Sequence, residues 1–307
     1  MNPVPHHQRA SRILFLGQAI FCSTISLFCA CNSLHRDDTS FADTQPAERS
    51  TLGIKEPGKY HFRDSQFVYY SDFPLKTDLP LFKELSDLRE QLYKELHLPP
   101  SDRIVQVFLF VDQASYEKYL KSHYAELPPR RAYFIKQDRV ANGTEELLVY
   151  TWWSEKVRQD LRHELTHGIL HSVLKDVPRW LDEGLAEVYE LPPENDGINA
   201  NYLDYFQDGR VDLDLNHLEK LSDVQQMLLP EYRQAWAWTH FILHSSRESK
   251  EVLLAYLQQL RLTNKPGPLL PRLKAVVDDP ATALRKYLAK LEAVPTARTD
   301  LFSGEKP

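Results

Sequence analysis

The chain has 307 residues, of which 42% are hydrophobic, enough to form a sizeable core in one large domain or two small ones. This composition excludes a disordered protein. The formal net charge of -6 and the lack of any block of Lys or Arg argue against a phosphate-backbone partner, so we expect no nucleic-acid binding.

The first 30 residues have the pattern of a secretory signal. Arg9 and Arg12 precede a mostly apolar stretch over residues 13–30, the order of charge and apolar residues typical of such signals. Ala30 before Cys31 is similar to the cleavage site of bacterial lipoproteins, which implies membrane attachment through a lipidated Cys31. The alternative is an uncleaved membrane anchor of near-spanning length. We expect an exported protein of the cell envelope, either lipid-anchored or periplasmic.

All three cysteines, Cys22, Cys29 and Cys31, lie within the first 31 residues. The mature domain is therefore expected to have no disulfide and no thiolate ligand for a metal. Residues 31–58 are polar and are expected to form a disordered tether, and residues 296–307 a disordered tail. The folded domain is expected to cover residues 59–295.

Strand and helix patterns alternate in the first part of this domain. We expect strands over residues 66–70, 103–111, 131–135 and 147–152, and helices over residues 78–97 and 113–124, with Asn142-Gly143 as a turn. The remaining part reads as helices. The fold class is therefore α+β: a small α/β lobe with a mixed sheet over residues 59–153, then a mainly helical lobe over residues 154–295.

A helix is expected over residues 154–175, with Ser154 as its N-cap. Val157 begins an apolar row that repeats every four residues and forms one face. His163 and His167 project from roughly the other side, one turn apart, so two imidazoles can bind one metal ion. Glu164 lies beside that ion without binding it, the position of a general base for water.

Two residues compete as the third metal ligand. His171 follows one turn later, but on an unbroken helix its Cα lies about 12 Å from that of His163, too far for one ion to bind all three. Glu183 lies on a second expected helix over residues 177–190, which would pack back across the first. Its carboxylate would complete a three-ligand zinc site and leave the fourth position for water, so Glu183 is preferred.

Glu187 follows Glu183 by one helical turn and faces the same way. Metal-bound histidines nearly always donate their other ring N–H to a carboxylate or carbonyl. We expect Glu187 to accept that hydrogen bond, with Asp182 and Asp160 as weaker candidates. Further helices are expected over residues 216–227, 231–245, 250–262, 269–277 and 282–294, whereas residues 191–209 lack periodicity and form either a wall of the site or a connector.

The segments 163–167 and 178–187 together resemble the gluzincin metallopeptidases, and more narrowly the bacterial metallopeptidases of the peptidase MA-like group, which are often exported. Residues 232–243 resemble the helix that follows the active site in that group. The resemblance implies a zincin-like helical lobe with an active-site cleft between the two lobes, a Zn²⁺ cofactor and a peptide or protein substrate. It also implies a downstream tyrosine or histidine that stabilises the oxyanion; Tyr232 and His240 are the candidates, with Tyr189 and His217 behind them.

The sequence therefore predicts a zinc-dependent hydrolase, most simply a peptidase in which Glu164 is the general base and Tyr232 assists. Two alternatives remain open. One is a non-catalytic envelope lipoprotein that keeps a zinc-binding fold, and the other is an enzyme that cleaves a different amide, such as a peptidoglycan cross-link. The sequence carries no signal for the oligomeric state.

Overall fold

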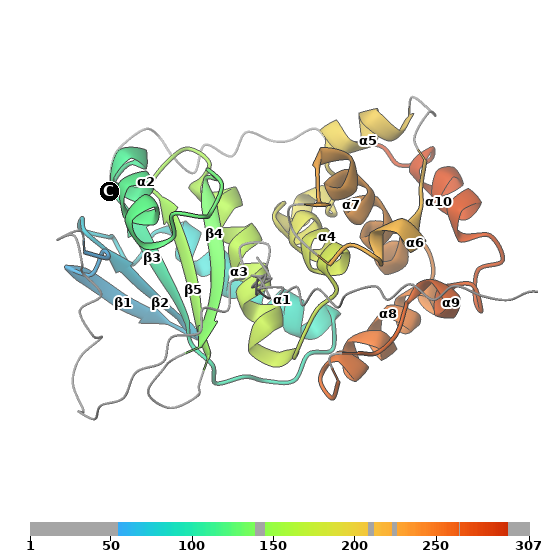
Figure 1. Ribbon diagram of the computed structural model, residues 1–307, viewed down its shortest axis with the longest axis horizontal. Helices are drawn as coiled ribbons and strands as arrows, with labels where there is room; N and C mark the ends of the chain where they lie inside the picture. Colours follow the sequence, from blue (N-terminus) through green and yellow to red (C-terminus); the bar gives the residue numbers. More distant parts are fainter. Residues whose placement is uncertain (1–54, 139–144, 208–211, 223–225, 264, 294–307) are drawn as a thin grey trace, which may run out of the picture.

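The computed structural model describes residues 55–138, 145–207, 212–222, 226–263 and 265–293 (Figure 1). The architecture is mixed α/β, with a five-stranded sheet toward one end of the molecule and a group of helices toward the other. The expected signal segment, most of the expected tether, the Asn142-Gly143 turn and the expected tail lie outside the described residues. No helix within the described ranges combines the length and apolar character needed to cross a bilayer.

The sheet is mixed, as the sequence predicted. Its strand order is β1-β2-β3-β5-β4, with antiparallel pairs at both edges and parallel pairs in the centre. The first strand, whose outer face is solvent-exposed, had not been predicted from the sequence. The strands are β1 Tyr60–Asp64, β2 Phe67–Ser71, β3 Val105–Phe110, β4 Ala132–Asp138 and β5 Glu145–Trp152.

The two faces of the sheet are covered by different helices. On one face, Phe108 stacks between Tyr70 and Tyr150 at ring distances of 5.0 Å each, and α2 (Gln113–His123) packs over this aromatic row. The other face is covered by α3 (Val157–Val173), which packs against α1 (Pro80–Glu95). Because α3 lies directly on the central strands, its position is fixed by the core of the sheet.

Helix α3 begins at Val157, three residues after the expected N-cap. Ser154 accepts a hydrogen bond from the Lys156 amide at 3.2 Å and therefore closes a turn before the helix. The apolar row that begins at Val157 is buried through Ile169, and its last member, Val173, is partly buried. Gly168 allows close packing, since a Cβ there would lie 3.0 Å from a methyl group of Val105 on β3.

Helix α4 (Arg179–Tyr189) lies between α3 and α7 (Leu229–His244), and every residue of α4 is buried. The contact with α7 is closest at Gly184. A Cβ on that residue would lie 2.5 Å from the carbonyl oxygen of Ala235 and even nearer the hydroxyl of Thr239. Only glycine fits at position 184. The candidate ligand Glu183 directly precedes it in the sequence, so the close contact between α4 and α7 lies next to that ligand.

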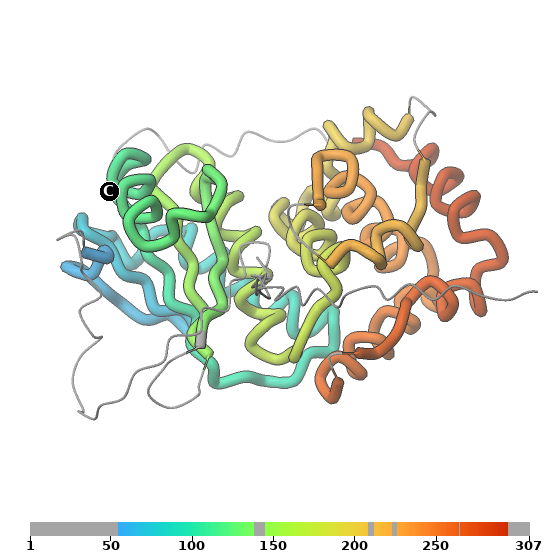
Figure 2. Tube along the Cα trace, viewed as in Figure 1, coloured from blue at the N-terminus to red at the C-terminus, as the bar shows by residue number. Residues whose placement is uncertain are grey.

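The remaining helices complete the end of the molecule away from the sheet (Figure 2). The segment expected to be irregular, residues 191–209, contains two helices, and the prediction was wrong there because a short amphipathic turn with Leu203 and Phe206 inside was overlooked. Two expected helices are much shorter than predicted. The elements are η1 Pro193–Asn195, α5 Ala200–Gln207, α6 Leu215–Leu218, α8 Arg247–Leu260, α9 Leu270–Leu273 and α10 Pro280–Leu288.

Candidate metal centre

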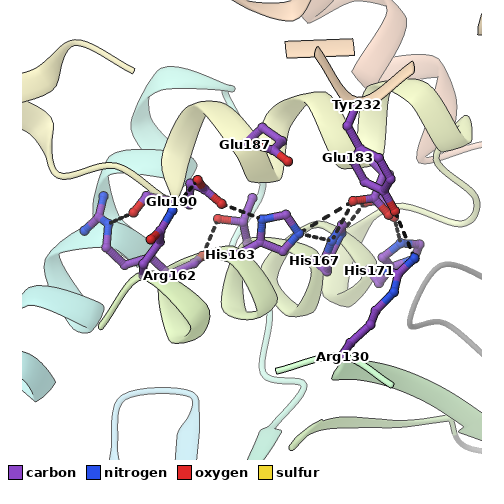
Figure 3. Close-up of polar contacts among 12 residues, drawn as sticks. Arg130, Arg162, His163, His167, His171, Glu183, Glu187, Glu190 and Tyr232 are labelled. Carbon is purple, nitrogen blue, oxygen red and sulfur yellow. Dashed lines mark hydrogen bonds and ion pairs between the residues drawn. The ribbon is translucent and has the colours of Figure 1, made fainter. Parts of the chain in front are cut away.

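Three side chains from α3 and α4 converge on one point (Figure 3). The Nε2 atoms of His163 and His167 lie 3.3 Å apart, and Oε2 of Glu183 lies 3.6 Å from the first and 3.8 Å from the second. The sequence placed the histidines one turn apart on α3 and the glutamate on the crossing helix. The structure brings all three together at distances suitable for one metal ion.

The spacing of these atoms fits a small divalent cation. A point equidistant from all three lies about 2.1 Å from each, which is the bond length of zinc to imidazole nitrogen and carboxylate oxygen. Two imidazoles and one carboxylate are also the donors of catalytic zinc sites, which leave a fourth position open. The geometry and the chemistry of the donor set therefore agree.

Glu183 adds an independent indication of a cation. Its side chain is 0% exposed, and neither carboxylate oxygen has a hydrogen-bond partner among the described residues. Burial, and then the charges of Glu187 and Glu190, raise the pKa of this carboxyl well above its ordinary value. A buried carboxylate without hydrogen bonds is costly unless a positive charge compensates it. A metal ion at the convergence point would supply that charge.

His163 is oriented by Glu190, a residue that the sequence analysis did not consider. His163 Nδ1 lies 3.0 Å from Oε2 of Glu190, and Gln159 donates to the other carboxylate oxygen at 2.6 Å. The backbone carbonyl of Glu190 accepts from Arg162, which is almost fully buried. With Nδ1 bound to the carboxylate, Nε2 of His163 is directed at the convergence point. Burial alone would lower the pKa of His163, but Glu190 and Glu164 raise it to about 9.

The expectation for Glu187 is corrected by this geometry. Glu187 accepts a hydrogen bond from the hydroxyl of Tyr202 at 3.1 Å rather than from a ligand histidine. Burial, followed by the charge of Glu190, raises its pKa to about 8. Asp160, a weaker candidate, binds Arg131 instead. Glu190, which lies about one helical turn beyond Glu187, thus has the role that we expected of Glu187.

His167 is oriented by Asp182, the other weaker candidate. Oδ1 of Asp182 lies 3.0 Å from Nδ1 of His167, and Oδ2 lies 3.1 Å from Nε2 of His171. Burial would raise the pKa of Asp182, but these two histidines hold it well below the ordinary value. His171 is therefore a buried partner of Asp182, not a third ligand, and it does not line the mouth of the site. Phe134 of β4 stacks on both rings at 6.0 and 5.4 Å.

The candidate base, Glu164, directly follows His163 on α3. Only 7% of its surface is exposed, and its Oε2 has no hydrogen-bond partner among the described residues. Its charge acts on Arg130, Tyr133 and His163. Glu164 is thus a buried carboxylate next to the candidate ligand His163, with one oxygen available for a proton donor.

Tyr232 extends from the first turn of α7 toward Glu183 (Figure 3). Its hydroxyl accepts a hydrogen bond from Nη2 of Arg130 at 3.1 Å. Burial and then the charge of Glu183 raise the pKa of Tyr232 above its ordinary value, so the phenol stays protonated at neutral pH. Tyr232 could be named from the sequence and Arg130 could not, since the two lie 102 residues apart and no motif joins them.

The other candidates for this role lie elsewhere. His240 contacts the Asp196 carbonyl at 2.9 Å and the hydroxyl of Tyr287 at 2.9 Å, so both of its ring nitrogens are engaged away from the site. Tyr189 donates to Glu95 at 2.8 Å. His217 is half exposed and lies 3.7 Å from Glu231. Of the four residues, only Tyr232 lies beside the three candidate ligands.

No protein-family model matches the chain, and no curated protein matches it.

Proposed function

We propose that the protein is a zinc-dependent hydrolase that cleaves peptide bonds. His163, His167 and Glu183 would hold the ion. The observation that carries the proposal is the triangle of ligand atoms with sides of 3.3, 3.6 and 3.8 Å, one corner of which is a buried carboxylate without a hydrogen bond. A further buried carboxylate, Glu164, adjoins this triangle, and a purely structural metal site has no need of it.

A zinc ion bound there would polarise the substrate carbonyl and lower the pKa of water to about 7. The protein residues then have separate tasks. Glu164 takes the proton of the attacking water and delivers it to the leaving amine, so that no covalent enzyme intermediate is needed. Glu190 and Asp182 keep Nδ1 of the two histidines engaged and their Nε2 atoms directed inward. Tyr232 donates its hydroxyl proton toward the oxygen that gains negative charge.

We propose that an extended peptide binds along β4. This strand is the last in the sheet order, and its Phe134 stacks on His167. An edge strand can pair with an extended peptide through backbone hydrogen bonds, which hold the chain without selecting its side chains. A peptide so held would lie between the sheet and α7, with a scissile bond near Tyr232. Such binding would correspond to the zincin-like arrangement of two lobes around a cleft that the resemblance implies.

Export to the cell envelope is part of the same proposal. It is supported by the charge and apolar pattern of residues 1–30 and by the three cysteines being confined to that end of the chain. The protein would then encounter its peptide or protein substrate outside the cytoplasm. It would be either anchored to a membrane through Cys31 or free in the periplasm.

The first prediction concerns Glu164→Gln. This change removes the proton acceptor but keeps the size of the side chain, so we expect zinc content to be retained and hydrolysis to fall by about 10²-fold or more. The purified wild type and variant are compared by metal analysis and by mass-spectrometric profiling of a broad peptide library, with and without chelator. Equal cleavage by the two proteins would refute the role of Glu164. A wild type that holds zinc but cleaves nothing would favour the non-catalytic alternative.

A further inference from the structure

The segment of residues 128–131, directly before β4, is fixed by side chains from the sheet region. Tyr116 donates its hydroxyl to the carbonyl of Arg130 at 3.0 Å, and Tyr133 donates to the carbonyl of Pro128. Two consecutive prolines further restrict the backbone here. The Cα of Arg130 is therefore held in place before any ligand binds, although the segment is a connection and not part of a strand or helix.

From this fixed backbone Arg130 reaches Tyr232 on α7 (Figure 3). A guanidinium group has only donors, so the phenol oxygen must be the acceptor in the 3.1 Å hydrogen bond. The hydroxyl proton of Tyr232 is then directed to an acceptor other than Arg130. The hydroxyl lies beside Glu183, where the candidate metal ligands converge, so a substrate oxygen at the metal would be on that side.

The surroundings of the Arg130–Tyr232 contact keep Arg130 positively charged and Tyr232 protonated. Burial would lower the pKa of Arg130, but Tyr232, Tyr133 and Glu164 raise it above its ordinary value. Arg130 therefore remains a cation within reach of the field of Glu164. A hydrogen bond from a cation withdraws electron density from the phenol oxygen and makes the hydroxyl a stronger donor.

We propose that Arg130 is a positioning residue, which orients and polarises the Tyr232 hydroxyl so that the two residues act as one unit on an oxyanion at the metal site. This inference rests on the proposed function for its reaction, though not for its geometry. The unit is assembled from the two parts of the chain that flank the metal centre, the segment before β4 and the first turn of α7. A latch that merely joined these parts would stabilise the fold but would not change the affinity for an oxyanion.

A double-mutant cycle tests the proposal in the full-length zinc-loaded protein. Arg130→Met removes the donors, Arg130→Lys keeps a cation that can only donate, and Tyr232→Phe removes the hydroxyl. The first readout is the affinity for phenylphosphonate, a tetrahedral oxyanion. It is measured by calorimetry and from the visible spectrum of the Co²⁺-substituted protein. The second is kcat and KM on the peptide that the wild type cleaves best. Zinc content and thermal unfolding are measured for every variant.

We expect Tyr232→Phe to lower kcat by about 10²-fold and Arg130→Met to lower it by about 10-fold, both with little change in KM. In the Tyr232→Phe background, Arg130→Met should change kcat and phenylphosphonate affinity by less than about 2-fold, because its effect passes through the missing hydroxyl. Arg130→Lys should recover most of the loss.

Three results would overturn the proposal. The first is an Arg130→Met loss of the same size in both backgrounds, which would mean that Arg130 acts directly or not through Tyr232. The second is an unchanged phenylphosphonate affinity, and the third is a loss fully matched by lost zinc or unfolded protein. A wild type without peptidase activity would end the proposed function, while the phenylphosphonate cycle would still decide the role of Arg130.

Discussion

The two candidate histidine ligands have different surroundings, and the difference divides the candidate metal centre into a deep end and a shallow end. At the deep end, His167 is 1% exposed and shares Asp182 with a second buried histidine, His171. At the shallow end, the side chain of His163 is 18% exposed and binds Glu190, a residue at the end of α4. The deep end therefore belongs to the hydrophobic core, whereas the shallow end can exchange protons and ligands with solvent.

The comparison predicts the largest effect at Asp182. Asp182→Ala leaves His167 and His171 without their shared carboxylate in the core, so we expect the metal-free protein to lose about 3 kcal/mol of unfolding free energy. Zinc affinity should fall about 100-fold, because the tautomer of His167 is no longer fixed. Urea unfolding and competitive zinc titration measure the two effects. If stability is unchanged, the deep end is not part of the folding core as we describe it.

Gly184 tests the same end through helix packing. Gly184→Ala forces apart α4 and α7 at the carbonyl of Ala235, and we expect a loss of about 1–3 kcal/mol together with weaker zinc binding. Gly58→Ala is the matched control, since a Cβ there meets nothing within 4 Å. Equal unfolding midpoints for the two variants would show that the α4–α7 contact is less tight than described.

Glu190→Gln should have a smaller effect, confined to the shallow end. The amide keeps the size of the side chain but removes the negative charge opposite His163 Nδ1, so we expect zinc affinity to fall by about 10-fold with little loss of stability. The contrast with Asp182→Ala is the informative result. Equal losses of stability in the two variants would remove the distinction between the ends.

The last effect is a pH dependence at the shallow end. The pKa of His163 is raised to about 9 in the folded metal-free protein, so protonation of His163 stabilises the fold below about pH 6.5, its unfolded value, and this stability is lost as pH rises to about 9. Zinc affinity should rise over the same range, because zinc must displace that proton. In Glu190→Gln, zinc affinity should reach its plateau at a lower pH than in the wild type. If zinc affinity depends on pH in the same way in both proteins, Glu190 is not the cause of the raised pKa of His163.

The motif on α3 and the carboxylate on α4 could be predicted because each ligand is set by helical spacing within a short stretch of sequence. Glu187 and Glu190 illustrate the limit: both lie on the face of Glu183, and three residues of spacing do not tell which of them meets His163. Only the packing of α3 against α4 decides, and helical spacing within one helix does not show it. The role of Arg130 could not be predicted for a similar reason, since its partner Tyr232 comes from a distant part of the chain.

The strand and helix pattern of the sheet region was recovered well because buried strands and amphipathic helices have strong periodicity. The first strand was missed because His61 and Arg63 occupy its exposed positions. Beyond α4, the expected irregular segment contains α5, whose only apolar signals inside are Leu203 and Phe206. Short helices of this kind are fixed by packing against neighbours more than by local sequence.

Helix α7 carries Tyr232 and, within the next two turns, the Ala235 and Thr239 contacts of Gly184. The separation between the phenol and Glu183 is consequently set inside one rigid helix pair. Changes in substrate preference, whether by selection or by engineering, should accumulate along the outer edge of β4, where the chain can vary without displacing a candidate ligand or Arg130. A library confined to those positions is thus the economical route to variants that keep their metal.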